Sequence, residues 1–282
     1  MNNNDFFMSA YGVRIPRIIY GTAWKKDRTA SYVEQAIMLG FRGIDTACQP
    51  KHYNEVGVGD GVTATLQRGV NRADLYLQSK FTSVNGQDPR CIPYDPQSSL
   101  NDQVAQSFQV SLRNLQTTYL DCLILHSPLA YPSQTQEVWQ AMERIFDDGG
   151  TKQLGISNCY NPAQFEWLHR IAKVKPAVLQ NRFYADTQYD HSLRAYCQKY
   201  QIIYQSFWTL SANPGILSHH ILGKLMRKYQ RSAAQIFFRY LTQINIIPLM
   251  GTTTVTHMQE DLAIFSFKLT TDECETVGAL LM

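Results

Sequence analysis

Short apolar runs alternate along the chain with longer segments in which apolar residues recur every three or four positions. Short apolar runs bounded by turn residues are typical of buried parallel strands, and the wider spacing is typical of helices with one buried face. The pattern predicts eight strands, at residues 18–20, 43–45, 75–77, 120–125, 154–156, 177–179, 202–204 and 244–248. A small hairpin is expected before the first strand, from residues 11–13 and 15–17.

Helices are predicted between the strands. They fall at residues 56–66, 100–115, 136–146, 191–199, 216–228 and 232–241, with others beginning near residues 31, 161 and 256. Ser31 and Glu34 have the spacing of a capping box, and Gly40 provides a stop for that helix. Thr270 and Glu273 repeat the capping-box spacing and predict an additional helix at the C-terminus.

Eight strands alternating with helices indicate parallel βαβ units. At 282 residues the chain fits a (β/α)8 TIM barrel, an α/β fold, better than an open sheet. The N-terminal hairpin and the C-terminal extra helix are additions to this barrel. Because no change of composition or linker interrupts the alternation, we expect a single domain over residues 1–282.

Composition narrows the class of protein. With 44% hydrophobic residues the chain can bury a full core, and its net charge of +3 is spread without basic runs, so neither nucleic acid nor a membrane is an expected partner. The six cysteines lack a C-x-x-C spacing, which favours reduced thiols and no metal site. No signal peptide or membrane span is recognisable, so we expect a cytoplasmic monomer or weak homo-oligomer.

Polar residues end five successive predicted strands. They are Asp45, Lys80, His126, Ser157 with Asn158, and Gln180. In a barrel the carboxyl ends of the strands surround one pocket, so these residues should meet there. Each has a structural alternative when taken alone, since Asp45 can cap the following helix, Lys80 can flank a strand and His126 can be an ordinary loop histidine.

The ring of polar groups suits the donation of a proton to a carbonyl oxygen. Tyr53 follows Asp45 in the stretch at residues 41–57 and can serve as the acid, or it can be a half-buried loop aromatic. Its ordinary pKa of about 10 is high for this task, and a nearby Lys80 cation is expected to lower the pKa. Asp45 would hold Lys80 in place, and His126 would orient the substrate oxygen.

The chain resembles the aldo-keto reductase family over nearly its whole length. The matching stretches, in order, are IPRIIYGTAW, GFRGIDTA followed by YNEVG, LYLQSKF, YLDCLILHSP, LGISN, VLQNRFY and IIPLMGTTTVTHMQEDL. The resemblance implies a barrel that binds a nicotinamide dinucleotide, NADPH rather than NADH, and reduces aldehydes or ketones. The G-x-G-x-x-G fingerprint of a Rossmann domain is absent from the sequence.

The resemblance also assigns site residues. The catalytic tetrad would be Asp45, Tyr53, Lys80 and His126. The cofactor contacts would come from Gly21, Thr22, Ala23, Ser157, Asn158, Gln180, Gln205, Ser206, Phe207, Gly251, Thr252, Thr253, His257, Glu260 and Asp261. The substrate contacts would come from Trp24, Tyr53, His126 and Trp208, and Tyr131 and the loop at residues 81–99 are expected to line the same pocket.

The sequence departs from the family pattern at three places. Residues 49–52 are additional between Asp45 and Tyr53, and Gln205 stands where many members have an aromatic residue that stacks on the nicotinamide. The basic residues that commonly hold the 2′-phosphate are replaced by residues 249–253 and His257, although a Gly-Thr-Thr loop before a helix can bind phosphate through backbone N–H groups.

The alternatives belong to two other classes. One is a barrel that binds the dinucleotide and acts as a regulatory or interaction protein, which the departures keep open. The other is a phosphate-binding lyase or isomerase, to which the hydroxyl of Ser157 and the amides of Asn158 and Gln180 are poorly suited. No residue identifies a particular aldehyde or ketone.

Overall fold

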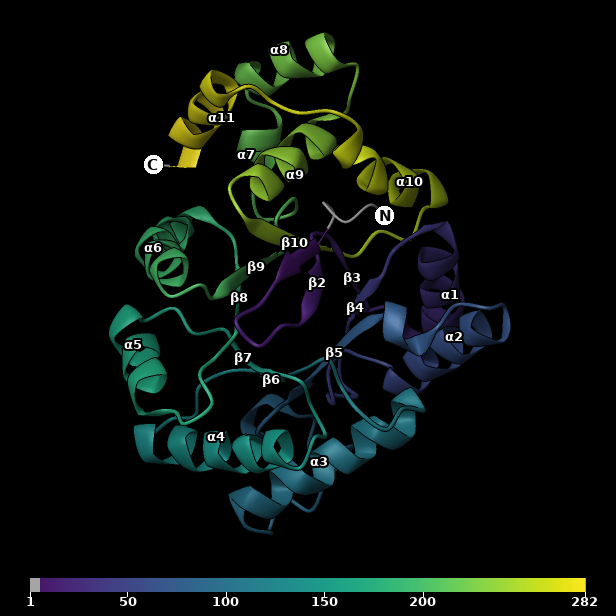
Figure 1. Cartoon of the computed structure of the whole chain (residues 1–282), viewed down its shortest axis with the longest axis vertical. Helices are drawn as coiled ribbons and strands as arrows, with labels where there is room; N and C mark the ends of the chain where they lie inside the picture. The colour runs from purple at the N-terminus through teal and green to yellow at the C-terminus, as the bar shows by residue number, and fades with distance from the viewer. Residues whose placement is uncertain (1–5, 282) are drawn as a thin grey trace.

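The computed structural model describes residues 6–281 and shows a closed parallel β-barrel surrounded by helices (Figure 1). The barrel strands are β3 (Ile19–Gly21), β4 (Gly43–Asp45), β5 (Tyr76–Phe81), β6 (Cys122–Leu125), β7 (Leu154–Ser157), β8 (Val178–Arg182), β9 (Ile203–Phe207) and β10 (Ile246–Met250). They follow one another around the barrel in sequence order, and β10 closes it against β3. The predicted TIM barrel is confirmed.

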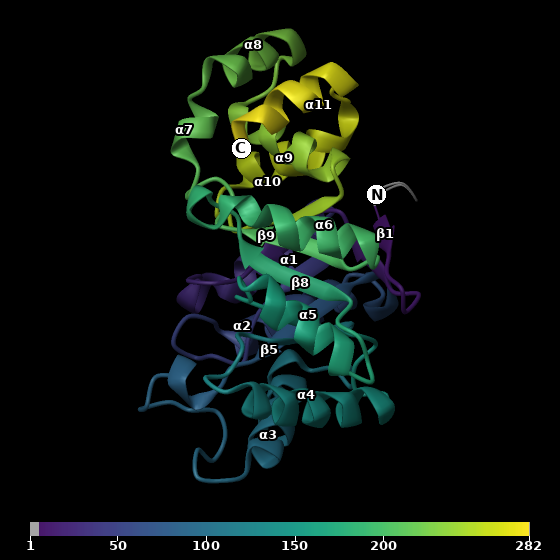
Figure 2. The same ribbon diagram turned by 90° about the vertical axis from the view of Figure 1, so that its left-hand side faces the viewer.

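Helices cover the outside of the barrel. They are α1 (Thr29–Leu39), α2 (Glu55–Gln67), α3 (Leu100–Leu115), α4 (Pro132–Asp147), α5 (Pro162–Ile171), α6 (His191–Lys199), α7 (Pro214–Leu217), α8 (His220–Tyr229), α9 (Ala233–Gln243), α10 (Val255–Leu262) and α11 (Thr271–Gly278). Helices α7 to α11 gather on the side of the barrel formed by β10, where α8 and α11 lie outside α9 (Figure 2). The predicted C-terminal helix is α11, and its capping box is present.

The N-terminal hairpin closes one end of the barrel. Strands β1 (Phe6–Met8) and β2 (Arg14–Pro16) pair antiparallel, and β2 lies across the middle of the ring (Figure 1). Val13 and Ile15 pack with apolar residues inside the barrel, such as Ile124 and Ile247. The hairpin itself was predicted, but its first strand lies further toward the N-terminus, because residues 9–13 form the turn.

The start of α1 corrects one prediction. Ser31 does not cap the helix, because α1 already begins at Thr29 and the Ser31 hydroxyl donates to the carbonyl of Arg28. The predicted stop is confirmed: Gly40 follows α1 with a φ of 127°, a conformation that strains other residues.

Helices α2 and α3 approach closely at a glycine. A Cβ atom on Gly59 would lie 2.1 Å from the carbonyl oxygen of Asn114, so only glycine allows this contact. The approach brings the N-terminal turn of α2 close to α3. There the buried carboxylate of Glu55 accepts hydrogen bonds from Ser79 on β5 and Ser111 on α3.

The long loop between β5 and α3 is held by hydrogen bonds to the residues that follow β4 and β5. The Tyr94 hydroxyl donates to the carbonyl of Thr82, and the Gln87 side chain donates to the carbonyls of Thr82 and Cys48. Gln49 donates in turn to the carbonyl of Gly86. The loop therefore braces the extra segment at residues 49–52.

Two features are absent from residues 6–281. Within that range no helix has the length and apolar character needed to cross a membrane. The same residues contain no cluster of three or more histidine, cysteine, aspartate or glutamate side chains suited to hold a metal ion.

Candidate active site

A cavity of about 880 Å³ opens at the carboxyl ends of the barrel strands. Terminal strand residues such as Gly21, Asp45, Ser157, Phe207 and Met250 contribute to its walls. The sequence-predicted site residues that line it are Gly21, Ala23, Trp24, Asp45, Tyr53, His126, Ser157, Asn158, Gln180, Phe207, Trp208, Gly251, Thr252, His257, Glu260 and Asp261. The barrel thus brings together polar groups from both halves of the chain.

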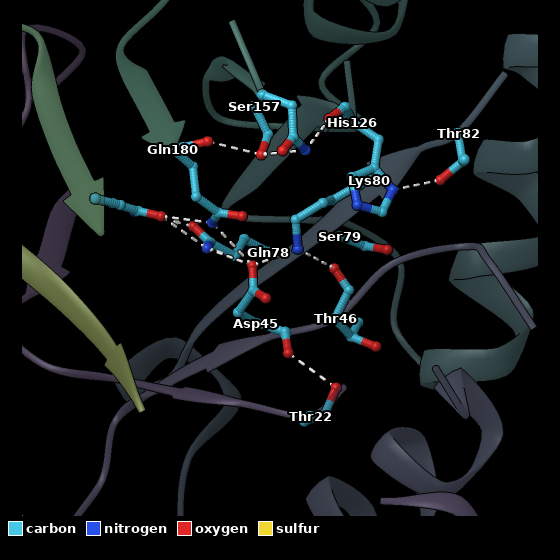
Figure 3. A network of polar contacts seen from close by, with 12 residues as sticks. Thr22, Asp45, Thr46, Gln78, Ser79, Lys80, Thr82, His126, Ser157 and Gln180 are labelled. Carbon is cyan, nitrogen blue, oxygen red and sulfur yellow. Dashed lines mark hydrogen bonds and ion pairs between the residues drawn. The ribbon is translucent and has the colours of Figure 1, made fainter. Parts of the chain in front are cut away.

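A buried ion pair lies beneath the cavity. The Lys80 ammonium is 2.6 Å from Oδ1 of Asp45 and also donates to the carbonyl of Thr46 at 2.8 Å (Figure 3). Lys80 does not itself line the cavity, whereas Asp45 does. The two charges are fixed because each has a partner and neither can turn to solvent.

Tyr53 lines the cavity above this pair. The Lys80 ammonium is 5.3 Å from the centre of the Tyr53 ring, and the hydroxyl has no hydrogen-bond partner among residues 6–281. Burial raises the pKa of the Tyr53 phenol well above its ordinary value, and the Asp45 carboxylate adds to this rise. The direction is opposite to the one expected from the sequence, since desolvation dominates and Asp45 offsets the charge of Lys80.

His126 faces Tyr53 with an edge-on ring contact, and the two ring centres are 6.1 Å apart. Burial, followed by the charges of Lys80 and His52, lowers the pKa of His126 to about 3, so the imidazole is neutral near pH 7. Its Nδ1 atom is 2.6 Å from the hydroxyl of Thr82 (Figure 3). The imidazole is therefore held in a fixed orientation beside the cavity.

The residues predicted to bind the carboxamide lie at the end of β7 and in β8. The Ser157 hydroxyl donates to the carbonyl of Gln180 at 2.7 Å, and the Asn158 side chain donates to the carbonyl of His126 at 2.8 Å. Asn158 adopts a φ of 52°, in the left-handed region, so the extended backbone of β7 ends here. These contacts connect the predicted carboxamide-binding residues to the predicted catalytic histidine.

The other predicted site residues, Thr22, Lys80, Gln205, Ser206 and Thr253, do not line the cavity. Gln205 is buried below it, in contact with the Gln78 and Gln180 side chains, and Ser206 accepts a hydrogen bond from Thr209. Thr22 donates to the carbonyl of Asp45, and Thr253 is exposed beside the opening.

Phe207 is the aromatic residue of β9 that reaches the cavity. Side chains alternate along a strand, so Phe207 and Gln205 face the barrel interior together. Phe207 packs against the interior cluster and lies nearer the mouth, whereas Gln205 is one layer deeper. Phe207 therefore supplies, two residues later, an aromatic side chain that is missing at Gln205.

The far end of the cavity is formed by the loop after β10 and by α10. Gly251, Thr252, His257, Glu260 and Asp261 line it. Burial, with a smaller contribution from the charge of Glu260, raises the pKa of Asp261 to about 7. This end is consequently less negative near neutral pH than its two acidic residues suggest.

Two tryptophans stand at the mouth. The indole of Trp24 lies 4.1 Å, centre to centre, from the His52 ring, and the Arg182 guanidinium lies 4.1 Å from the centre of the Trp208 ring. Tyr131 was expected to line the pocket, but it is absent from the lining, and so are residues 81–99, all of which the structure describes. Both expectations are wrong, because these residues lie outside or behind the cavity wall.

Residues that the sequence interpretation missed also belong to the site. Lys25 is buried, lines the cavity and donates to the carbonyl of Gly251, and burial lowers its pKa. Gln78 interrupts an apolar strand two positions before Lys80, so period-two alternation could have placed it inside the barrel. Thr82 and His52 gave no sequence signal, since their contacts are to loops.

The sequence profile of the Aldo/keto reductase family matches residues 17–281. The chain belongs to this family. Aldo-keto reductases reduce carbonyl groups, so the chain is an oxidoreductase. It is 30% identical to the uncharacterized oxidoreductase YtbE of Bacillus subtilis (strain 168), an alignment that covers 88% of this chain and 82% of that one.

Two further relatives extend the comparison. The NADPH-dependent alpha-keto amide reductase of Saccharomyces cerevisiae is 25% identical over 99% of this chain and 91% of its own length. The crystal structure of an aldo/keto reductase from Brucella melitensis is 26% identical, covers 98% of both chains and superposes with a TM-score of 0.83. The aldo-keto reductase barrel is thus matched along almost the entire chain.

Proposed function

We propose that this aldo-keto reductase reduces aldehydes or ketones to alcohols with a nicotinamide dinucleotide, NADPH in preference to NADH, and that Tyr53 is its general acid. The observation that carries the proposal is that Tyr53 lines the cavity beside the neutral His126 and near the Asp45–Lys80 pair, with a hydroxyl that has no hydrogen-bond partner among residues 6–281. These are the groups that proton donation to a carbonyl oxygen requires.

The residues present fit the dinucleotide. Ser157, Asn158 and Gln180 offer amide and hydroxyl groups for the nicotinamide carboxamide, and Phe207 offers an aromatic face for the ring. At the other end, the loop that holds Gly251 precedes the N-terminus of α10, where backbone N–H groups favour phosphate. When bound, the reduced cofactor supplies the hydride.

The protein supplies the proton and the orientation. The phenol of Tyr53 is protonated at neutral pH because its pKa is raised, and it donates this proton to the substrate oxygen as negative charge develops there. The Lys80 cation near its ring stabilises the resulting phenolate. The Thr82 hydroxyl lies 2.6 Å from Nδ1 of His126, and in the tautomer whose Nδ1 accepts this hydrogen bond, the Nε2–H donates to the same substrate oxygen.

The preference for NADPH rests on basic side chains near the far end of the cavity, where Gly251 and α10 lie. Lys25 and His257 line the cavity there. A second hollow, lined by Arg227 and Arg231, shares Ser232 and Glu260 with the cavity. Quenching of tryptophan fluorescence should therefore show tighter binding of NADPH than of NADH, and the reverse order would contradict the preference.

The proposed acid is tested by Tyr53→Phe. We expect turnover of an aldehyde panel to fall about 100-fold or more, with NADPH affinity unchanged, because only the transferable proton is removed. Tyr131→Phe is the matched control, since this tyrosine is 66% exposed and lies outside the cavity, and its turnover should be unaffected. Near-normal turnover by Tyr53→Phe would sink the assignment.

A binding-only role is the alternative outcome. NADPH bound by the unmodified protein without turnover of any aldehyde or ketone in a broad panel would favour the regulatory or interaction barrel instead. The buried Gln205, where many members carry the stacking aromatic, is the feature that favours this alternative.

A further inference from the structure

A layer of buried amide side chains crosses the barrel below the cavity. Asp45 on β4 pairs in register with Gln78 on β5, and Gln180 on β8 pairs in register with Gln205 on β9. Two strands separate these pairs on either side of the barrel, so the pairs face each other across its interior. Gln78 and Gln205 are 0% exposed, and neither has a role in the mechanism described above.

The four side chains form one hydrogen-bonded network. Gln78 donates to Oδ1 of Asp45 at 2.7 Å and to Oε1 of Gln205 at 2.9 Å. Gln180 donates to the same two acceptors, at 3.1 and 2.9 Å. Gln205 donates back to Oε1 of Gln78 at 3.1 Å, and Figure 3 shows Gln78, Gln180 and Asp45 converging at this point.

The network permits one orientation of each amide. Since an ionised carboxylate only accepts hydrogen bonds, Gln78 and Gln180 must both turn their NH2 groups toward Asp45. Their second N–H groups then meet Gln205, which must present its oxygen to both. The orientation of every amide is thus dictated by the chemistry of its neighbours.

Gln180 is the member of this network that lines the cavity. Both of its N–H groups are engaged below the cavity, and its Oε1 atom has no partner among residues 6–281. Rotating the amide by 180° would place this oxygen against the oxygens of Asp45 and Gln205 and would break both hydrogen bonds. Gln180 therefore presents an acceptor, and not a donor, to a ligand.

We propose that Gln78 and Gln205 are positioning residues that lock Gln180 as an acceptor, so that the site selects the amino group of a carboxamide. The inference rests on the proposed binding of a nicotinamide dinucleotide. At the position where many family members have an aromatic residue that stacks on the nicotinamide, Gln205 instead orients the Gln180 amide, and Gln78 completes the network. Removing the Gln205 amide breaks one of the two hydrogen bonds that fix Gln180 and weakens this selection. Gln78 acts on Gln180 indirectly, through Gln205 and Asp45.

The test compares NADP+ with its 3-acetylpyridine analogue, in which a methyl group replaces the carboxamide NH2 and the carbonyl is kept. Dissociation constants are measured from the quenching of tryptophan fluorescence, since Trp24 and Trp208 line the cavity. The unmodified protein should bind NADP+ about fivefold more tightly or better, because the analogue leaves Oε1 of Gln180 unpaired.

In Gln205→Met this ratio should fall about threefold or more. In Gln78→Met it should fall less, because Gln180 keeps its hydrogen bonds to Asp45 and Gln205. Gln153→Met is the matched control: Gln153 is also 0% exposed, but it donates to Tyr76, away from the Gln180 network, and its loss should leave the ratio unchanged. A general loss of stability would alter both dissociation constants together and would not change their ratio.

Two results separate this inference from the function on which it rests. Equal binding of both dinucleotides by the unmodified protein, or an unchanged ratio in Gln205→Met, would overturn the inference alone. Failure of the unmodified protein to bind either dinucleotide would overturn the proposed function, and the inference with it. The first comparison needs no variant, so a misfolded Gln205→Met protein does not leave the question open.

Discussion

Removing one member of the Asp45–Lys80 pair should destabilise the protein unequally, depending on which member is removed. The Lys80 side chain is 1% exposed and the Asp45 side chain 4%. In Lys80→Met, the carboxylate keeps the hydrogen bonds from Gln78 and Gln180. In Asp45→Asn, the ammonium keeps only the carbonyl of Thr46 and a neutral amide oxygen.

The magnitudes follow from these remaining partners. Leaving a buried charge without its partner costs about 3–5 kcal/mol, which is the loss expected for Asp45→Asn. A hydrogen bond to a charged group contributes about 1.5–3 kcal/mol, so the two that remain on Asp45 should reduce the loss in Lys80→Met to about 1–3 kcal/mol. The double variant buries no charge and should lose about 2 kcal/mol less than the sum of the single losses.

Urea denaturation of the four proteins at pH 7 measures these free energies of unfolding. Equal slopes with denaturant concentration would establish that the unfolded states are comparable. Additive losses in the double-mutant cycle would refute the reasoning, and so would a Lys80→Met protein that is less stable than Asp45→Asn.

Two further predictions concern single side chains. Burial raises the pKa of Asp261 to about 7, so the folded state holds this proton more tightly than the unfolded state, and stability should fall as the pH rises from about 4 to 7. Asp261→Asn should therefore gain roughly 2–4 kcal/mol over the unmodified protein at pH 8 and almost nothing at pH 4, whereas a pH-independent difference in urea denaturation would contradict this. Thr82→Val should lower kcat/KM about five- to tenfold without weakening NADPH binding, because His126 loses the hydrogen bond at Nδ1, and Thr82→Ser should restore it. Equal kcat/KM values for Thr82→Val and the unmodified protein would exclude this role.

The fold was largely predictable because apolar runs and helix caps are local signals. The prediction failed mainly at strand ends, where β5, β8 and β9 continue through Gln78, Gln180 and Gln205. A polar residue normally marks the end of an apolar strand in the sequence, but each of these glutamines is hydrogen-bonded to a side chain on another strand. The compensation depends on the closed barrel and is invisible to any local pattern.

The candidate site was predictable as a set of residues but not in its electrostatics. The strand-end rule and the family pattern brought Asp45, Tyr53 and His126 to one cavity. The predicted direction of the Tyr53 pKa shift was wrong. The shift depends on the burial of the phenol and on the charge of Asp45, which offsets that of Lys80. Neither quantity can be read from sequence spacing.

Residues 49–52 form part of the rim of the cavity, and the loop at residues 82–99 holds them in place through a hydrogen bond. Gln49 and His52 line the cavity, while the loop contacts Gln49 through the hydrogen bond to the carbonyl of Gly86, and Gln49 in turn contacts His52. The two segments form one exchangeable unit, although some thirty residues separate them in the sequence. A transplant that alters the width of this rim must carry both, because either segment alone would leave the other without its counterpart.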